Sequence, residues 1–124
     1  MKCKAYAQRV FCYNYSKCLS FYKDTIGLPL KLGNEDTGWA EFDVDGLSLA
    51  IEKLDINDQE SNALVGRFIG LSLEVDDLSM VYEELKSKGV EFTSAPKQQS
   101  WGGALAHFKD PAGNILTLLQ SGNA

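Results

Sequence analysis

One arginine and one histidine are the side chains of this sequence that could most directly bind or transform a small molecule. The guanidinium of Arg9 could hold a carboxylate or phosphate through two parallel hydrogen bonds. His107 is the only histidine in the chain, and histidine is a side chain that could move a proton or sense charge. Both residues also have structural interpretations. Arg9 could brace a sheet through an ion pair with Glu52 or Glu74, and a lone histidine is more often a hydrogen-bonded wall residue.

Three glutamates and four aromatic residues extend this set. Glu41, Glu52 and Glu74 fall, by alternation along their strands, on the faces opposite the apolar layer, where they would either line a site for a cation or be solvated. A flat ligand could stack on an aromatic side chain, although aromatic residues on strands also serve cores and dimer interfaces. The four aromatic candidates are Phe11, Tyr13, Trp39 and Trp101. Trp101 precedes Gly102-Gly103, where a gate could hinge.

The elements that must position these residues occur twice along the chain. Helix boundaries recur at an offset of 62 residues, with Asn14 and Asp76 at the starts and Gly27 and Gly89 at the ends. Either Asp76 or its neighbour Asp77 could cap the second helix. Each copy has an apolar face that it cannot bury alone, so the copies are expected to pack against each other or against a partner chain.

Alternation of apolar and polar residues predicts the strands, and each half is expected to run β-α-β-β-β. Residues 4–13 place Tyr6, Gln8, Val10 and Cys12 on one face and Ala7, Arg9, Phe11 and Tyr13 on the other. Residues 39–44 and 47–52 form a hairpin around Asp45-Gly46. Further strands are predicted at 68–75, 91–93, 104–109 and 114–120, and a polar linker at 55–62. We therefore expect one domain, 1–124, with a first module of about 1–55 and a second of about 66–124.

Length and composition limit the classes of function. The chain has 124 residues, a formal charge of -5 and scattered lysines, which argues against a nucleic-acid surface. No run approaches the roughly 20 apolar residues that a membrane span needs, and the first residues do not resemble a secretory signal. The three cysteines, Cys3, Cys12 and Cys18, are odd in number and do not suggest a disulfide framework. These features predict a cytoplasmic protein without nucleic-acid or membrane partners.

Four short motifs, in order along almost the whole chain, carry a resemblance to a known family. They are Phe21-Tyr22-Lys23-Asp24-Thr25-Ile26-Gly27-Leu28, Val75-Asp76-Asp77-Leu78, Trp101-Gly102-Gly103 and Asp110-Pro111-Ala112-Gly113-Asn114. The chain resembles the vicinal oxygen chelate superfamily, which includes glyoxalase I, extradiol dioxygenases, fosfomycin-resistance enzymes and bleomycin-resistance proteins. The resemblance implies an α+β fold in which two βαβββ modules form a curved eight-stranded mixed sheet with a central cleft, usually completed by homodimerisation. It implies less about activity, because one fold hosts many functions.

Metal-dependent relatives hold a divalent metal through up to four side chains, typically His and Glu, on the first, fourth, fifth and eighth strands. The resemblance places those positions at Ala7, Ala50, Gly70 and Thr117, none of which is a competent ligand. A register shift of two residues would bring in Glu52, but one carboxylate without a histidine makes a poor site. We therefore predict no metal and no other cofactor.

The resulting hypothesis is a metal-free protein of the bleomycin-resistance type that binds, and sequesters, a small planar organic molecule such as an antibiotic. The residues predicted to bind it are Arg9, Phe11, Trp39, Glu52, Glu74, Trp101 and His107. A cationic aromatic ligand is expected to bind best, because of the glutamates. No catalytic residue is assigned. The alternative is a metal-independent isomerase or lyase using Arg9, Glu52 and His107, and a third possibility is a scaffold with an empty cleft.

Overall fold

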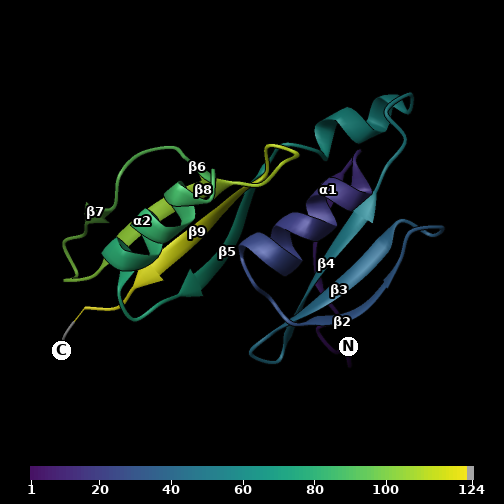
Figure 1. Cartoon of the computed structure of the whole chain (residues 1–124). Coiled ribbons are helices and arrows are strands. Elements are labelled where there is room, and N and C mark those ends of the chain that lie inside the picture. Colours follow the sequence, from purple (N-terminus) through teal and green to yellow (C-terminus); the bar gives the residue numbers. More distant parts are fainter. Residues whose placement is uncertain (123–124) are drawn as a thin grey trace. The chain divides into compact units, whose positions relative to one another are not determined.

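The computed structural model describes residues 1–122 and contains two compact units, one from Met1 to Gly66 and one from Arg67 onward (Figure 1). The first unit contains β1 (Gln8–Cys12), α1 (Tyr15–Ser20), the π-helical turn Phe21–Thr25, β2 (Leu30–Asn34), β3 (Trp39–Val44), β4 (Leu47–Lys53) and the 3-10 turn Gln59–Ala63. The second contains β5 (Phe68–Glu74), α2 (Leu78–Ser87), β6 (Glu91–Phe92), β7 (Lys97–Gln98), β8 (Ala104–Lys109) and β9 (Ile115–Gln120). The second predicted module extends to 124, and its residues 123 and 124 lie outside the described chain.

The first unit is a four-stranded mixed sheet with strand order β1-β4-β3-β2. β1 runs parallel to β4, while β3 pairs antiparallel with both β4 and β2. One face carries most of the fully buried side chains, among them Val10, Phe42 and Ile51, and α1 packs on this face with Tyr22 of the π-helical turn. Burial of such side chains supplies the main stabilising free energy, roughly 1.5–3 kcal/mol each.

The second unit repeats this plan. Its sheet has the order β5-β9-β8-β6, with β7 pairing β8 outside that path. α2 packs on β8 and β9, and the core of this unit includes Phe108, Leu116 and Leu78. β5 runs parallel to β9, as β1 does to β4, so the two units share one connectivity.

The helix boundaries follow the sequence signals closely. Asn14 caps α1 by accepting a hydrogen bond from the backbone N–H of Lys17, and Asp77 caps α2 by accepting from Met80. Asp77 is thus the cap, rather than Asp76 at the offset of 62. Gly27 and Gly89, which follow the two helices, have φ angles of 82° and 89°, a region that strongly favours glycine.

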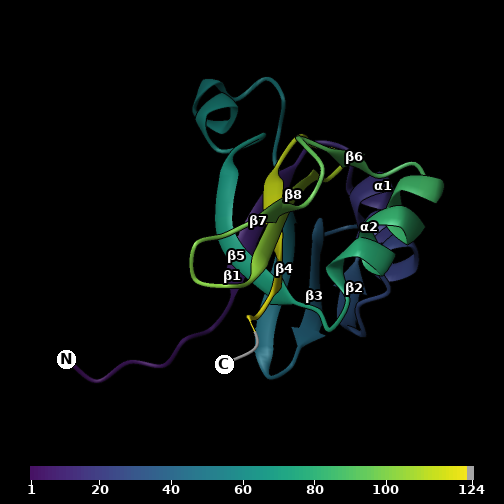
Figure 2. The same ribbon diagram turned by 90° about the vertical axis from the view of Figure 1, so that its left-hand side faces the viewer.

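The structure confirms the predicted α+β fold class and modifies it in detail. Its nine strands between residues 1 and 122 form one sheet of four and one of five, so β7 is an addition to the expected eight. The predicted strand 4–13 begins only at Gln8, and residues 1–7 form an arm without regular structure (Figure 2). The polar linker contains the 3-10 turn, which Asp58 caps through a hydrogen bond from Glu60.

Trp101, predicted as a gate beside two glycines, lies at the tip of a hydrogen-bonded hairpin between β7 and β8. The backbone N–H of Gln99 donates to the carbonyl of Gly103 at 2.8 Å, and the backbone N–H of Gly102 donates to the carbonyl of Gln99 at 3.1 Å. The indole covers Gly103, where an added Cβ would stand 1.8 Å from Trp101 Cζ3 and 2.3 Å from the carbonyl oxygen of Gln120. Trp101 is nevertheless 52% exposed. The structure therefore shows a packed hairpin tip around this tryptophan.

This close approach predicts that Gly103→Ala lowers the free energy of unfolding by roughly 1–3 kcal/mol, because the methyl group must displace the indole or the backbone. Gly70→Ala is the matched control, since no atom lies within 4 Å of a Cβ added there. Its effect should stay within about 0.5 kcal/mol. Urea denaturation of both variants measures the difference, and equal stabilities would contradict the packing described for Trp101.

Candidate functional site

Cross-strand register gathers most of the residues predicted in the first unit on one face of its sheet. Arg9 pairs with Ala50 across β1 and β4, and Ala50 pairs with Glu41 across β4 and β3. The next row runs from Phe11 through Glu52 to Trp39. Paired residues on adjacent strands point to the same side of a sheet, so both rows share the face opposite α1. Ala50, between the two larger side chains of its row, is fully buried.

Arg9 and Glu52 form an ion pair, as one interpretation of the sequence expected. The distance from Arg9 Nη1 to Glu52 Oε1 is 3.1 Å, and the guanidinium also lies over the ring of Phe11, 5.2 Å from its centroid. The Arg9 side chain is 54% exposed, so the pair contributes at most about 1 kcal/mol to stability. A ligand that offered an anion or a second aromatic face could therefore recruit this guanidinium at small cost.

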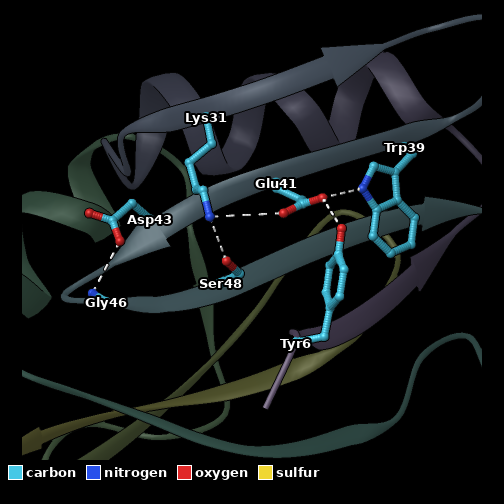
Figure 3. Close-up of polar contacts among 7 residues, drawn as sticks. All are labelled: Tyr6, Lys31, Trp39, Glu41, Asp43, Gly46 and Ser48. Atoms are coloured by element: carbon cyan, nitrogen blue, oxygen red, sulfur yellow. Dashed lines mark hydrogen bonds and ion pairs between the residues drawn. The ribbon is translucent and has the colours of Figure 1, made fainter. Parts of the chain in front are cut away.

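Glu41 is buried, whereas the sequence suggested that it either lines an open acidic cleft or is solvated. It is only 5% exposed. Its Oε2 atom accepts hydrogen bonds from Trp39 Nε1 at 2.9 Å and from the hydroxyl of Tyr6 at 3.0 Å (Figure 3). Its other oxygen lies 4.0 Å from Lys31 Nζ, which itself donates to Ser48 Oγ at 2.9 Å. The buried carboxylate thus has partners on β2, on its own strand β3 and on the N-terminal arm.

Tyr6 is the largest departure from the predicted faces. Alternation placed it with Val10 and Cys12 on the side that packs beneath α1, but the strand begins only at Gln8, so the alternation does not extend to Tyr6. The free arm turns the phenol toward Glu41 on the other face, and its ring remains largely in solvent. The hydrogen bond to Glu41, with the negative charge of that carboxylate, raises the pKa of Tyr6.

A hollow of about 340 Å³ opens beside this cluster. Its lining residues are Tyr6, Ala7, Arg9 and Trp39, all from the first unit. Two aromatic side chains, one guanidinium and a small residue make a concave surface suited to a flat molecule, with the Glu41 carboxylate beneath the aromatic pair. Phe11 and Glu52 adjoin this surface through their contacts with Arg9.

In the second unit, His107 occupies the row Ser72–Thr117–His107, which corresponds in its pairing to Arg9–Ala50–Glu41. Its Nδ1 atom lies 2.8 Å from the hydroxyl oxygen of Thr117, and its ring meets that of Phe68 edge-on with centroids 5.6 Å apart. These contacts agree with the wall-residue interpretation of His107. Glu74 accepts a short hydrogen bond from the hydroxyl of Ser121.

The side chains do not fit the divalent metal that many relatives of this fold hold. Ala7, Ala50 and Gly70 offer no donor atom, and the Thr117 hydroxyl is hydrogen-bonded to His107. Within residues 1–122, no group of three or more His, Cys, Asp or Glu side chains is arranged to hold an ion. No helix in this range is long and apolar enough to cross a membrane.

Tyr6 was not a candidate in the sequence, and Glu41 was a candidate for an acidic lining but was not among the residues predicted to bind the ligand. Glu41 had a usable signal, since it is separated from Trp39 by one residue and so shares its face of a strand. Tyr6 had none, because its position depends on where β1 begins.

Comparison with known proteins identifies the family. The family model described as Glyoxalase/Bleomycin resistance protein/Dioxygenase superfamily matches residues 6–118. A bleomycin resistance protein of Klebsiella pneumoniae is 41% identical over 56 residues, covering 40% of this chain and 44% of that protein. A member of the same superfamily from Sphaerobacter thermophilus has a TM-score of 0.80 at 23% identity, covering 97% of this chain and 98% of the other. TnmS3, an antibiotic binding protein from Streptomyces sp. CB03234, is 26% identical with a TM-score of 0.72, covering 98% of this chain and 99% of the other. The chain therefore belongs to the glyoxalase/bleomycin resistance protein/dioxygenase superfamily.

Proposed function

We propose that this protein binds a planar aromatic small molecule without a metal, and that sequestration of a toxic compound such as an antibiotic is its activity. The observation that carries the proposal is the hollow beside Trp39 and Arg9, which offers an aromatic face and a guanidinium. Further support comes from two relatives, one named as a bleomycin resistance protein and the other as an antibiotic binding protein. Binding requires shape, apolar walls and a few placed polar groups, all available on this face of the sheet.

The charges around the hollow change the ligand preference expected from sequence. Glu52 is paired with Arg9, and Glu41 is buried beside Lys31, so two positive and two negative side chains offset one another. Stacking on Trp39 is therefore proposed to contribute more to affinity than the sign of the ligand's charge. Aromatic cations and aromatic carboxylates should both bind, while small carboxylates without a ring should bind weakly.

A thermal-shift screen of the full chain tests the proposal. A ligand present at one hundred times its dissociation constant adds about 2.7 kcal/mol to stability, which raises the melting temperature by several degrees. Planar aromatic compounds are expected to give such shifts, and addition of divalent metals or of a chelator should not alter them. If no aromatic compound shifted the melting temperature, the binding function would be wrong. Chemical conversion of a bound compound would favour the isomerase or lyase alternative.

Two further features complete the proposal. We place the protein in the cytoplasm, where the buried thiols of Cys12 and Cys18 would remain reduced. We also propose a homodimer, because β2 lies at the edge of its sheet with Leu30 and Leu32 exposed. Sedimentation at several concentrations measures the oligomeric state.

A further inference from the structure

A buried carboxylate accepts a hydrogen bond from the hydroxyl of an exposed tyrosine at the candidate site. Glu41 is 5% exposed and Tyr6 is 72% exposed, yet the Tyr6 hydroxyl reaches Glu41 Oε2 at 3.0 Å. Tyr6 belongs to the arm of residues 1–7, which has no helix or strand to hold it. The hydroxyl end of this phenol is therefore engaged, while most of its surface faces solvent.

Glu41 keeps other partners when the Tyr6 hydrogen bond is removed. Trp39 Nε1 donates to the same oxygen at 2.9 Å, and Lys31 Nζ lies 4.0 Å from the other oxygen. A carboxylate oxygen can accept two hydrogen bonds, so a new donor could replace the Tyr6 hydroxyl without disturbing Trp39. Replacing one donor by another of the same kind conserves the number of hydrogen bonds, and the exchange is consequently inexpensive.

The exchange would also create room at the hollow. Tyr6 and Ala7 of the arm supply half of its lining, and the other half comes from Arg9 on β1 and Trp39 on β3. Movement of the arm would leave Arg9 and Trp39 in place. It would also expose Glu41 Oε2 to solvent. The space vacated has the shape of an aromatic ring and ends at a hydrogen-bond acceptor.

We propose that Tyr6 occupies the ligand's place: an aromatic ring bearing an O–H or N–H donor binds Glu41 where the phenol now lies and displaces the N-terminal arm. This inference rests on the proposed function and specifies its ligand class, namely phenols, aryl amines or N–H heteroaromatics. Tyr6 then acts as an internal competitor. The apparent association constant of every such ligand equals its intrinsic value multiplied by the fraction of molecules in which the arm is detached.

A matched pair of compounds tests the donor requirement. Isothermal titration of the full chain would compare 2-naphthol with 2-methoxynaphthalene, which has the same ring system without the donor. The wild-type protein is expected to bind 2-naphthol at least about tenfold more tightly, the factor typical of one well-formed hydrogen bond to a charged acceptor. Glu41→Gln keeps the volume and one acceptor oxygen, and it should reduce this ratio toward one.

A matched set of variants tests the competition. Tyr6→Ala should bind 2-naphthol more tightly than the wild type, by up to about tenfold if the arm is attached in nine molecules of ten. Tyr6→Phe keeps the ring but has no hydroxyl for Glu41, and it should fall between the two. Because Tyr6 is exposed, both variants are expected to fold, and their melting temperatures provide the check.

Movement of the arm can be followed independently of affinity. Cys3 is exposed on the arm while Cys12 and Cys18 are buried, so a maleimide dye will react first at Cys3. Saturation with 2-naphthol should lower the fluorescence anisotropy of the dye, because the released arm rotates more freely. Tyr6→Ala should show the lower anisotropy before any compound is added.

The outcomes separate this inference from the function on which it rests. Equal affinity for the two naphthalenes with unchanged anisotropy, or no binding of 2-naphthol even to Tyr6→Ala, would overturn the displacement of Tyr6. Thermal shifts with other planar aromatics would in that case still support the binding function. If no aromatic compound bound at all, both proposals would fail together.

Discussion

Asp110→Ala is expected to lower the free energy of unfolding by about 3 kcal/mol, because it removes an acceptor on which several buried donors depend. Asp110 Oδ1 accepts hydrogen bonds from the backbone N–H groups of Ala112 and Asn114, both at 2.9 Å, and Oδ2 accepts from Asn114 Nδ2 at 3.0 Å. Asn114 is completely buried, and its Oδ1 atom in turn accepts from the backbone N–H of Arg67. Urea denaturation followed by circular dichroism measures the loss.

Asp43→Ala is the matched control for this prediction. Asp43 is the penultimate residue of β3, and Asp110 directly follows β8. The Oδ1 atom of Asp43 accepts from the backbone N–H of Gly46 at 3.1 Å (Figure 3). Asp43 is exposed, so water can replace the lost acceptor, and the cost should not exceed about 1 kcal/mol. Similar losses of unfolding free energy for the two variants would contradict the prediction, because burial of the carboxylate would then not determine how much each turn contributes to stability.

The same turn explains why the fold could be predicted from the sequence. Asp110-Pro111-Ala112-Gly113-Asn114 is a local arrangement in which the Asp110 side chain accepts from the backbone N–H groups of Ala112 and Asn114 within the turn. Helix caps such as Asn14 and helix-ending glycines such as Gly27 are equally local. Because each of these signals acts within about five residues, alternation and spacing were enough to find most of the elements and their order, although not β7.

The candidate site depends on relationships that no single segment contains. Alternation along β3 places Trp39 and Glu41 on one face, but only the register of β3 and β4 brings Ala50 beside Glu41. Register between strands is set by packing of the whole sheet, so it could not be derived from one strand at a time. The sequence allowed Arg9 to pair with Glu52 or Glu74, and the pairing of β1 with β4 brings it to Glu52.

Tyr6 illustrates a second limit of sequence patterns. The strand predicted over residues 4–13 included Tyr6 and placed it on the same face as Val10. β4 extends from Leu47 to Lys53, and its pairing with β1 begins at Gln8 and Leu49. Tyr6 lies before the first paired residue of β1, so strand pairing does not fix the direction of its side chain. Its hydroxyl donates a hydrogen bond to Glu41 on the other face of the sheet.

Trp39→Ala is expected to weaken the binding of planar aromatic compounds by roughly 2–4 kcal/mol, or about 30- to 1000-fold. The indole forms one wall of the hollow, so its removal takes away a stacking surface. Its Nε1 atom also donates to Glu41 Oε2 at 2.9 Å, and this hydrogen bond helps to orient the buried carboxylate. Isothermal titration measures the loss of affinity for 2-naphthol, which has a donor for Glu41, and for an aromatic cation without such a donor.

Two variants divide this effect into its parts. Trp39→Phe retains an aromatic face but lacks the N–H group, so it should recover most of the affinity for the aromatic cation and less of that for 2-naphthol, whose acceptor is no longer held in place. Trp101→Ala removes the other tryptophan of the chain, which lies in the second unit on the β7–β8 hairpin, and tests whether that indole also contacts the ligand. If Trp101→Ala weakened binding while Trp39→Ala did not, the site would have to be reassigned from the four-stranded sheet to the second unit. If both did, each tryptophan would contribute to binding, and the hollow beside Trp39 would be only part of the site.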